Sequence, residues 1–404
     1  MEFKKILDLK EDSYYIYDED RLVRNFNEFL NAFKKYYNNV EIAYSYKTNY
    51  LPKLCSKIEE LGGIAEVVSE MELDLALRIA KRKKIIFNGP YKNKDSIIKA
   101  IENGVIIHID NIDELVIIND FLKHRKDLRC NVGIRINLSI DQKKPSRFGI
   151  NPSEIENILE SIDSNDRINL EGIHCHLPNR ELNSFKFRCK EILRIYDKFF
   201  KNKINYIDIG GGFPSKLQKP LSEKLNIEDI HINEYAKKIG VIFNDYFKKL
   251  PHNKLPKLIL EPGTAIVANT LSFYSKIISE KKIGNKIILT STGSMFNFKG
   301  PNNTNLNFPF EEIIDLRTSN RESRLCDVSG YTCIENDYLL KDVNLKLRKG
   351  DFLRVEDIGS YSIVMKPPFI SPNVPIFMIT EDKIIEVKRR ETPNDIFNTF
   401  LFDD

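Results

Sequence analysis

The chain has 404 residues, of which 42% are hydrophobic and 30% are charged, so one large domain or two ordinary domains with a sizeable core can form. Its 62 basic and 58 acidic residues leave a net charge of only +4, which gives no case for binding nucleic acid or a membrane surface. No apolar run has the form of a signal peptide or the length of a membrane span, and the six cysteines form no Cys-x-x-Cys pair. We therefore expect a cytoplasmic protein without a zinc site or a disulfide framework.

Apolar strand-like runs alternate with helical patterns between about residues 40 and 262. A helix predicted over 19–37 precedes them. The predicted strands are 40–46, 64–68, 84–87, 105–110, 130–137, 168–175, 204–209 and 257–261. The helices predicted between them are 51–61, 70–81, 93–103, 111–124, 152–163, 184–201 and 232–250. Eight strands, each followed by a helix or a crossover, predict a parallel (β/α)8 barrel.

The pattern changes after residue 265, where short strand-like pieces are separated by Gly, Pro and Asn clusters. The predicted pieces are 271–278, 286–290, 352–355, 376–379 and 383–388. They indicate an antiparallel β-domain. The predicted division is therefore a barrel over 18–264 and a β-domain over 265–404, to which residues 1–17 add a strand at 13–17.

Polar or glycine-rich residues stand at the carboxyl end of every predicted barrel strand, where barrel enzymes place their chemistry. In chain order they are Lys47, Glu66, Asn88 to Pro90, His108 with Asp110, Arg135 with Asn137, His174 with His176, Gly210 to Gly212, and Glu261 to Gly263. Any one of them could be a helix cap or a turn. All eight together on one rim predict an active site.

Lys47 ends the apolar, alternating run that begins at Val40. Burying an unpaired ammonium is costly, and a depressed pKa or a covalent partner avoids that cost. A neutral lysine amine attacks aldehydes, which is the Schiff-base chemistry of pyridoxal phosphate enzymes. The alternative is a lysine at a strand end that reaches out to water.

Two further rim motifs suit such a cofactor. Gly210, Gly211 and Gly212 lack Cβ atoms, so their N–H groups can approach an anion such as a phosphate closely, although a plain turn is the alternative. Glu261 follows three apolar residues and could keep a pyridine nitrogen protonated, although an ion pair within the barrel is the alternative.

Two residues outside these motifs carry reactive groups. His176 could stack on a cofactor ring or belong to a structural histidine pair with His174. The His-x-His spacing also resembles a metal pair, but no carboxylate or cysteine nearby in sequence completes a ligand set, so no metal is expected. Cys333 lies in a polar segment, 327–337, where a reactive thiol is plausible although a free cysteine is usually inert.

With these residues in view, the chain resembles the fold-type III pyridoxal phosphate decarboxylases over about residues 12–380, in the group that contains ornithine, diaminopimelate and arginine decarboxylases. The matching segments are Tyr46 to Asn49, Ile173 to His176, Gly210 to Gly212, Glu261 to Gly263, Gly330 to Asp337 and Gly359 to Tyr361. The resemblance implies an alanine racemase-like barrel and pyridoxal 5'-phosphate as the cofactor. It also implies a Schiff base on Lys47, ring stacking by His176, a phosphate loop at Gly210 to Gly212 and a phosphate contact from Tyr361.

The chain departs from the family at four places. Pro178 and Asn179 stand where the family commonly has Gly-Ser, and Thr264 replaces an arginine near the phosphate. Ile334 replaces the acid that usually binds the far amine of a diamino acid, and the stretch 301–310 lacks an Arg-Pro that diaminopimelate enzymes use. The last two changes predict that the substrate is neither diaminopimelate nor ornithine, but a different or carrier-linked amino acid.

The predicted function is pyridoxal phosphate-dependent decarboxylation of an amino acid in a homodimer with shared active sites. Lys47, His176 and Cys333 are the predicted catalytic residues, with Cys333 supplied by the partner subunit. The other predicted cofactor contacts are Glu66, Arg135, Asn179, Gly210, Gly211, Gly212, Glu261, Gly263, Thr264 and Tyr361, and the predicted substrate contacts are Ile334, Glu335 and Asp337. The alternatives are an amino-acid racemase of the same fold, against which Cys333 argues, and an inactive regulatory homologue, against which Lys47 and Cys333 both argue.

Overall fold

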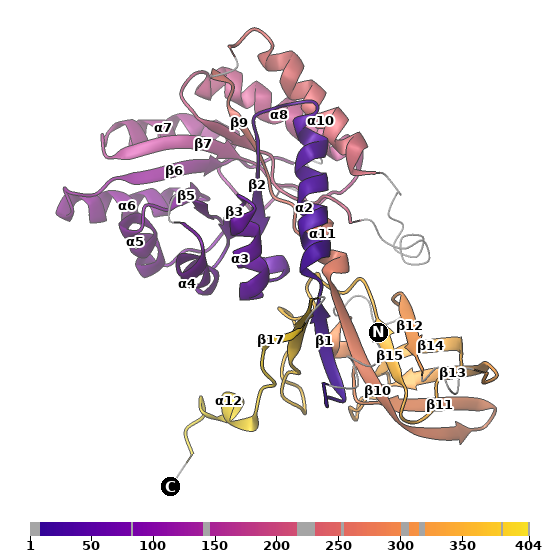
Figure 1. The fold of residues 1–404 in the computed structure, drawn as a ribbon. Coiled ribbons are helices and arrows are strands. Elements are labelled where there is room, and N and C mark those ends of the chain that lie inside the picture. Colours follow the sequence, from indigo (N-terminus) through magenta and orange to yellow (C-terminus); the bar gives the residue numbers. More distant parts are fainter. Residues whose placement is uncertain are drawn as a thin grey trace. The chain divides into compact units, whose positions relative to one another are not determined.

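The computed structural model of the chain describes residues 9–81, 84–139, 146–215, 231–251, 254–299, 307–314, 320–380 and 383–402 (Figure 1). Its contacts divide the chain into two compact units. Described residues between 23 and 266 form the first, here called the barrel unit. Described residues before 23 and after 266 form the second, here called the sheet unit.

The barrel unit is a closed parallel barrel, which confirms the predicted fold class. Its strands are β2 (Val40–Ser45), β3 (Ile64–Val67), β4 (Ile85–Phe87), β5 (Ile106–Ile109), β6 (Cys130–Arg135), β7 (Ile168–His174), β8 (Tyr206–Asp208) and β9 (Lys257–Leu260). They follow one another around the barrel in chain order, and β9 closes the ring by pairing with β2. Every strand lies within the range predicted for it.

Helices cover the outside of the barrel (Figure 1). They are α2 (Glu19–Lys34), α3 (Pro52–Glu60), α4 (Glu70–Ile79), α5 (Lys94–Glu102), α6 (Ile112–His124), α7 (Ile155–Asp163), α8 (Leu182–Ile195), α10 (Ile232–Phe247) and α11 (Thr264–Val267). Several of them begin where a polar side chain accepts a hydrogen bond from the first turn, among them α4 at Ser69, α5 at Asn93, α6 at Asn111 and α10 at His231. These caps determine the residue at which each helix begins after its strand.

Glycines on two neighbouring strands make room for an aromatic side chain inside the barrel. Tyr206 is buried, and its ring occupies the space that a Cβ atom on Gly172 would fill. A Cβ atom on Gly133 would lie 2.5 Å from the Tyr206 hydroxyl and 2.6 Å from the His108 ring. The interior is therefore closely packed, and polar groups reach a ligand at the strand ends.

The sheet unit contains a nine-stranded sheet among the described residues. Its strands are β1 (Ser13–Tyr17), β10 (Leu271–Ile283), β11 (Lys286–Ser291), β12 (Phe310–Ile313), β13 (Arg324–Ser329), β14 (Tyr338–Leu345), β15 (Phe352–Val355), β16 (Ile376–Ile379) and β17 (Ile384–Lys388). Most pairs are antiparallel, as expected, but β1 pairs with β16 and β11 pairs with β13 in parallel, so the sheet is mixed. The short helix α12 (Pro393–Phe397) follows the last strand.

Strands β12, β13 and β14 were not predicted from the sequence. In β14, exposed and buried residues alternate over only part of the strand. The pairings of β13 with β14 also shift register twice. Such irregular pairing weakens the two-residue period that reveals a strand.

Among the described helices, none has both the length and the apolar character needed to cross a membrane.

Candidate active site

A cavity of about 730 Å³ opens at the carboxyl ends of the strands in the barrel unit. This volume lies within the usual range for small-molecule sites. Six of the predicted site residues line the cavity: Lys47, Glu66, Arg135, His176, Asn179 and Glu261. The structure therefore brings together side chains that stand up to 214 positions apart in the chain, from 47 to 261.

Lys47 lies two residues beyond the end of its strand and not at the strand end itself. Strand β2 ends at Ser45, and Lys47 belongs to the one-turn helix η1 (Tyr46–Thr48). Its Nζ atom lies 2.8 Å from Oε2 of Glu66, whose side chain is fully buried. The lysine thus has a carboxylate partner at the cavity wall, and Glu66 is a base beside the amine.

Glu261 is buried and accepts hydrogen bonds from groups on other strands. Asn88 Nδ2 donates to its Oε1 atom at 3.1 Å, and His174 Nε2 lies 3.3 Å from the same oxygen. Burial opposes ionisation, but the neighbouring histidines, His174 above all, hold the pKa of Glu261 well below its usual range. A fixed anion therefore stands at the cavity floor.

Asp208 is the second carboxyl group beside this anion. It is fully buried, and its Oδ1 atom accepts only the N–H of Gly210, at 2.8 Å, among the described residues. Burial first, and then the charge of Glu261, raises the pKa of Asp208 well above its usual value. Asp208 is therefore the protonated member of the pair and Glu261 the ionised one, since Glu261 has the stronger hydrogen-bond partners.

This difference predicts a pH-dependent effect of Asp208→Asn on stability. An unfolded aspartate ionises near pH 3.8, whereas folded Asp208 keeps its proton to higher pH. Its stabilising contribution is complete below the unfolded pKa and is lost as pH rises through the folded pKa. The asparagine variant mimics the protonated form, so its melting temperature should rise relative to wild type as pH increases from the unfolded value of 3.8 into the neutral range.

Thermal unfolding of both proteins across this range measures the effect, and Asp163→Asn, at an exposed position, is the control. A difference in melting temperature that stays constant with pH would contradict the assignment of the proton to Asp208.

The three glycines after β8 lie beside Glu261 and His176. Gly210 and Gly212 have φ angles of +71° and +94°, which only glycine adopts without strain. A Cβ atom on Gly211 would collide with the carbonyl oxygen of Glu261. The Gly211 N–H donates to His176 Nδ1 at 3.1 Å, and burial lowers the pKa of His176, so the ring is neutral. The loop fits a site where a backbone must approach a ligand closely.

Arginine side chains give the cavity a cationic wall that the sequence indicated only in part. Arg135 pairs with Asp110 at 3.3 Å, and its guanidinium lies 4.6 Å from the centre of the Phe148 ring. Arg147 lies 4.1 Å from the same ring centre and also lines the cavity. Arg147, Phe148 and Asn88 were not predicted as site residues. Of these, only Asn88 had a signal, its place at a strand end.

The segment that follows β9 contacts the turn that carries Lys47. A Cβ atom on Gly263 would collide with Thr48 Oγ1, so glycine is required where these two segments meet. Thr264 then begins α11. The positions of Lys47 and Glu261 are thereby linked through direct packing.

Two groups of side chains could also reach a common metal ion: His108 with His174 and Asp208, and His174 with His176 and Glu261. The sequence had indicated no carboxylate near the histidines. Glu261 and Asp208 come from distant strands, so their separation in the sequence did not reveal that they lie beside the histidines. The expectation that the site binds no metal stays a prediction. The hydrogen bonds already described occupy several of these atoms.

The remaining predicted residues belong to the sheet unit. Cys333, Ile334 and Glu335 are exposed on the turn between β13 and β14. Tyr361 is 38% exposed and has a φ angle of +63°.

Asp337 was predicted to contact the substrate, but its side chain is hydrogen-bonded within the sheet unit. It is buried, and its Oδ1 atom accepts hydrogen bonds from Met295 N–H at 2.8 Å and from the Ser294 hydroxyl at 3.0 Å. Its Oδ2 atom accepts the Thr332 hydroxyl at 2.6 Å. With both oxygens occupied, Asp337 holds the turn that presents Cys333.

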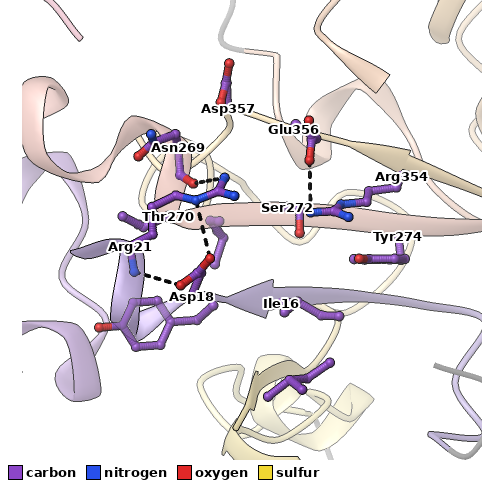
Figure 2. Close-up of a pocket in the computed structure, with 13 residues that line it drawn as sticks. Ile16, Asp18, Arg21, Asn269, Thr270, Ser272, Tyr274, Arg354, Glu356 and Asp357 are labelled. Atoms are coloured by element: carbon purple, nitrogen blue, oxygen red, sulfur yellow. Dashed lines mark hydrogen bonds and ion pairs between the residues drawn. The ribbon is translucent and has the colours of Figure 1, made fainter. Parts of the chain in front are cut away.

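A smaller pocket of about 240 Å³ lies in the sheet unit, beside β1 and β10 (Figure 2). Both of its arginines are paired with carboxylates: Arg21 with Asp18 at 3.3 Å, and Arg354 with Glu356 at 2.9 Å. None of the predicted site residues lines it. We therefore place the candidate active site in the larger cavity.

The residues of the larger cavity fit pyridoxal phosphate. They offer an amine for its aldehyde at Lys47 and an anion for its ring nitrogen at Glu261. The glycine loop packs so closely against Cys175, His176 and Glu261 that Cβ atoms on Gly210 and Gly211 would collide with them, so its backbone lies directly beside these site residues. This combination defines a barrel enzyme that uses a lysine-bound aldehyde cofactor.

Comparison with known proteins identifies the family. Residues 20–268 match the family described as pyridoxal-dependent decarboxylase, pyridoxal binding domain. The chain therefore belongs to the pyridoxal-dependent decarboxylases, and it is a carboxy-lyase whose cofactor is pyridoxal 5'-phosphate.

Similar proteins extend over nearly the whole chain. Diaminopimelate decarboxylase of Methanocaldococcus jannaschii is 28% identical over 95% of this chain and 89% of that protein. The Aquifex aeolicus enzyme of the same name is 24% identical over 93% of this chain and 89% of its own length. A crystal structure of Helicobacter pylori diaminopimelate decarboxylase in complex with L-lysine has a TM-score of 0.83, with 24% identity and 98% of both chains covered. This last likeness establishes the fold.

These findings contradict the expectation that diaminopimelate is excluded as a substrate. That expectation was wrong because it relied on single positions. Ile334 is one exposed residue of a turn, and its neighbour Glu335 is an exposed acid. Most of the stretch 301–310 lies outside the described residues.

Proposed function

We propose that this enzyme decarboxylates diaminopimelate to lysine. The observation that carries the proposal is similarity over at least 93% of the chain to proteins named diaminopimelate decarboxylase. The substrate has an amine and a carboxylate at each end, and the cationic wall of Arg135 and Arg147 suits a carboxylate. The presence of L-lysine in the Helicobacter pylori structure is consistent with such a product.

The barrel residues have distinct roles in this proposal. The bound cofactor supplies an electron sink for the pair released when the carbon–carboxylate bond breaks. The Lys47 amine would hold the cofactor through its aldehyde, and Glu66 would pair with that amine when it is free. Glu261 would keep the ring nitrogen protonated, and the neutral His176 would lie beside the ring. The proposed phosphate contacts are Asn179, Gly210, Gly211, Gly212, Gly263, Thr264 and Tyr361.

We further propose that two copies of the chain share their active sites. Cys333 of the partner subunit donates a proton to the carbon that has lost its carboxylate. Glu335 of the partner subunit binds the distal ammonium of the substrate. It thereby takes the role of the acid that usually stands at the position of Ile334. An exposed turn held rigidly by Asp337 suits such a contribution in trans.

Mixing two inactive variants tests the shared site. Lys47→Ala and Cys333→Ala homodimers should each lose activity, whereas a mixed dimer has one site with both residues intact. Random exchange of subunits should therefore restore roughly a quarter of wild-type activity. Release of carbon dioxide before and after mixing measures this. A mixture that stays inactive, although the subunits have exchanged, would contradict a shared site.

Release of carbon dioxide from single amino acids tests the substrate. Diaminopimelate should react at least about a hundredfold faster, in kcat/KM, than ornithine, arginine or lysine, because an unmatched charged end leaves buried groups unpaired. The product should be lysine. A preference for another amino acid would contradict the proposed substrate. Inversion of stereochemistry without loss of carbon dioxide would support the racemase alternative instead.

A further inference from the structure

A buried arginine on the helix behind the glycine loop has no role in the site described so far. Arg188 belongs to α8 and is fully buried. Its Nη1 atom donates to the carbonyl oxygens of Ile209, at 2.9 Å, and Gly211, at 2.8 Å. Its Nη2 atom donates to those of Leu177, at 3.1 Å, and Asn179, at 3.2 Å. One guanidinium thus joins the segments that follow β7 and β8.

The charge of Arg188 has no carboxylate within ion-pair distance in the described part of the chain. Its other close neighbour is the Phe185 ring, whose centre lies 4.0 Å from the guanidinium carbon. Burying a cation with only neutral acceptors is costly. An anion on the far side of the loop would offset that cost, since charges interact strongly across a poorly solvated interior.

The hydrogen bond to Gly211 also sets the direction of a backbone donor. In a trans peptide the C=O and the following N–H point in opposite directions. Because the Gly211 carbonyl points toward Arg188, the Gly212 N–H points away from it. No described residue accepts this N–H. The φ angle of Gly212 is +94°, so only glycine adopts this backbone conformation without strain.

We propose that Arg188 is a positioning residue for the cofactor phosphate. It aims the Gly212 N–H at the phosphate and sets a positive charge behind the loop without contacting the ligand. The same side chain fixes the carbonyl groups of Leu177 and Asn179, two residues that line the cavity. This inference rests on the proposed assignment of the glycine loop to the phosphate.

Comparing two cofactors that differ only in the phosphate tests the inference. Arg188→Met keeps much of the side-chain volume but removes the charge and the donors. Binding of pyridoxal 5'-phosphate and of pyridoxal is followed by the absorbance of the adduct with Lys47. The variant should bind the phosphate form about tenfold to a hundredfold more weakly, while its affinity for pyridoxal changes little.

Two further variants make the result specific. Arg194→Met, on the same helix, removes a side chain that is 63% exposed and pairs with Glu191, so both affinities should stay at wild-type values. Arg188→Lys keeps the charge but cannot reach four carbonyls, so its loss should be intermediate. If Arg188→Met does not fold, the ratio of the two affinities in Arg188→Lys decides the question.

Two outcomes would overturn the inference: equal losses for both cofactors, or no loss for either. A wild-type protein that forms an adduct with neither compound at Lys47 would instead contradict the proposed site itself. The two failures are therefore distinguishable.

Discussion

Replacing Lys47 with alanine is expected to lower kcat for decarboxylation by at least about a thousandfold. The side chain provides the amine that holds the cofactor, and no other lysine lines the cavity among the described residues. Its distance of 2.8 Å from Glu66 places a proton acceptor beside it. The loss should appear in kcat as well as in cofactor retention, because both functions depend on the same Nζ atom.

Lys47→Arg separates the covalent role from the ion pair. Arginine keeps a positive charge beside Glu66 but has no primary amine, so its activity should fall as far as that of the alanine variant. Borohydride reduction of the wild-type holoenzyme, followed by mass spectrometry, should locate the added cofactor mass on Lys47. Activity near the wild-type level in either variant would refute the assignment.

Glu261→Gln is expected to lower kcat by about a hundredfold to a thousandfold, the scale found when one electrostatic group aimed at the reacting centre is removed. Glutamine has nearly the same shape as glutamate, so packing against Asn88 and His174 should survive while the negative charge is lost. The affinity for pyridoxal phosphate should change much less than kcat, because the covalent and phosphate attachments remain.

The pH profile adds a second measurement. The pKa of Glu261 lies well below its usual range, so the wild-type carboxylate stays ionised at neutral and alkaline pH. The ratio of wild-type to variant kcat should therefore be constant across neutral and alkaline pH. Glu41→Gln is the control, since Glu41 also belongs to the barrel but pairs with Lys257 at 3.2 Å. A ratio that falls toward one as pH falls through the neutral range would contradict a fixed anion, because wild-type Glu261 would then be protonated like the glutamine variant.

The fold was predictable because each barrel strand is recognisable from its own stretch of sequence. Each of the eight is a short apolar run bounded by a cap or a glycine, and all were located to within a few residues. The irregular strands β13 and β14 lack such a run. Their pairing depends on partners elsewhere in the sheet, so no window of the sequence contains the signal.

The site was predictable where a residue follows its own strand. Lys47, Glu66 and Glu261 do so, and the structure brings all three to one cavity. Asp337 follows no such rule, since its burial depends on Ser294 and Met295, more than forty residues earlier. The substrate was misjudged for a related reason: Ile334 was interpreted without the exposed acid beside it.

The packing of Gly263 against Thr48 has a consequence for assembly of the protein. Strands β2 and β9 are the first and the last of the barrel, so the Lys47 turn and the Glu261 segment meet only at the seam where the ring closes. A folding intermediate that lacks β9 would have Lys47 and its partner Glu66, but not the carboxylate of Glu261. The cofactor therefore binds tightly only when the barrel is closed. Its binding free energy then stabilises the closed barrel and not the open intermediate.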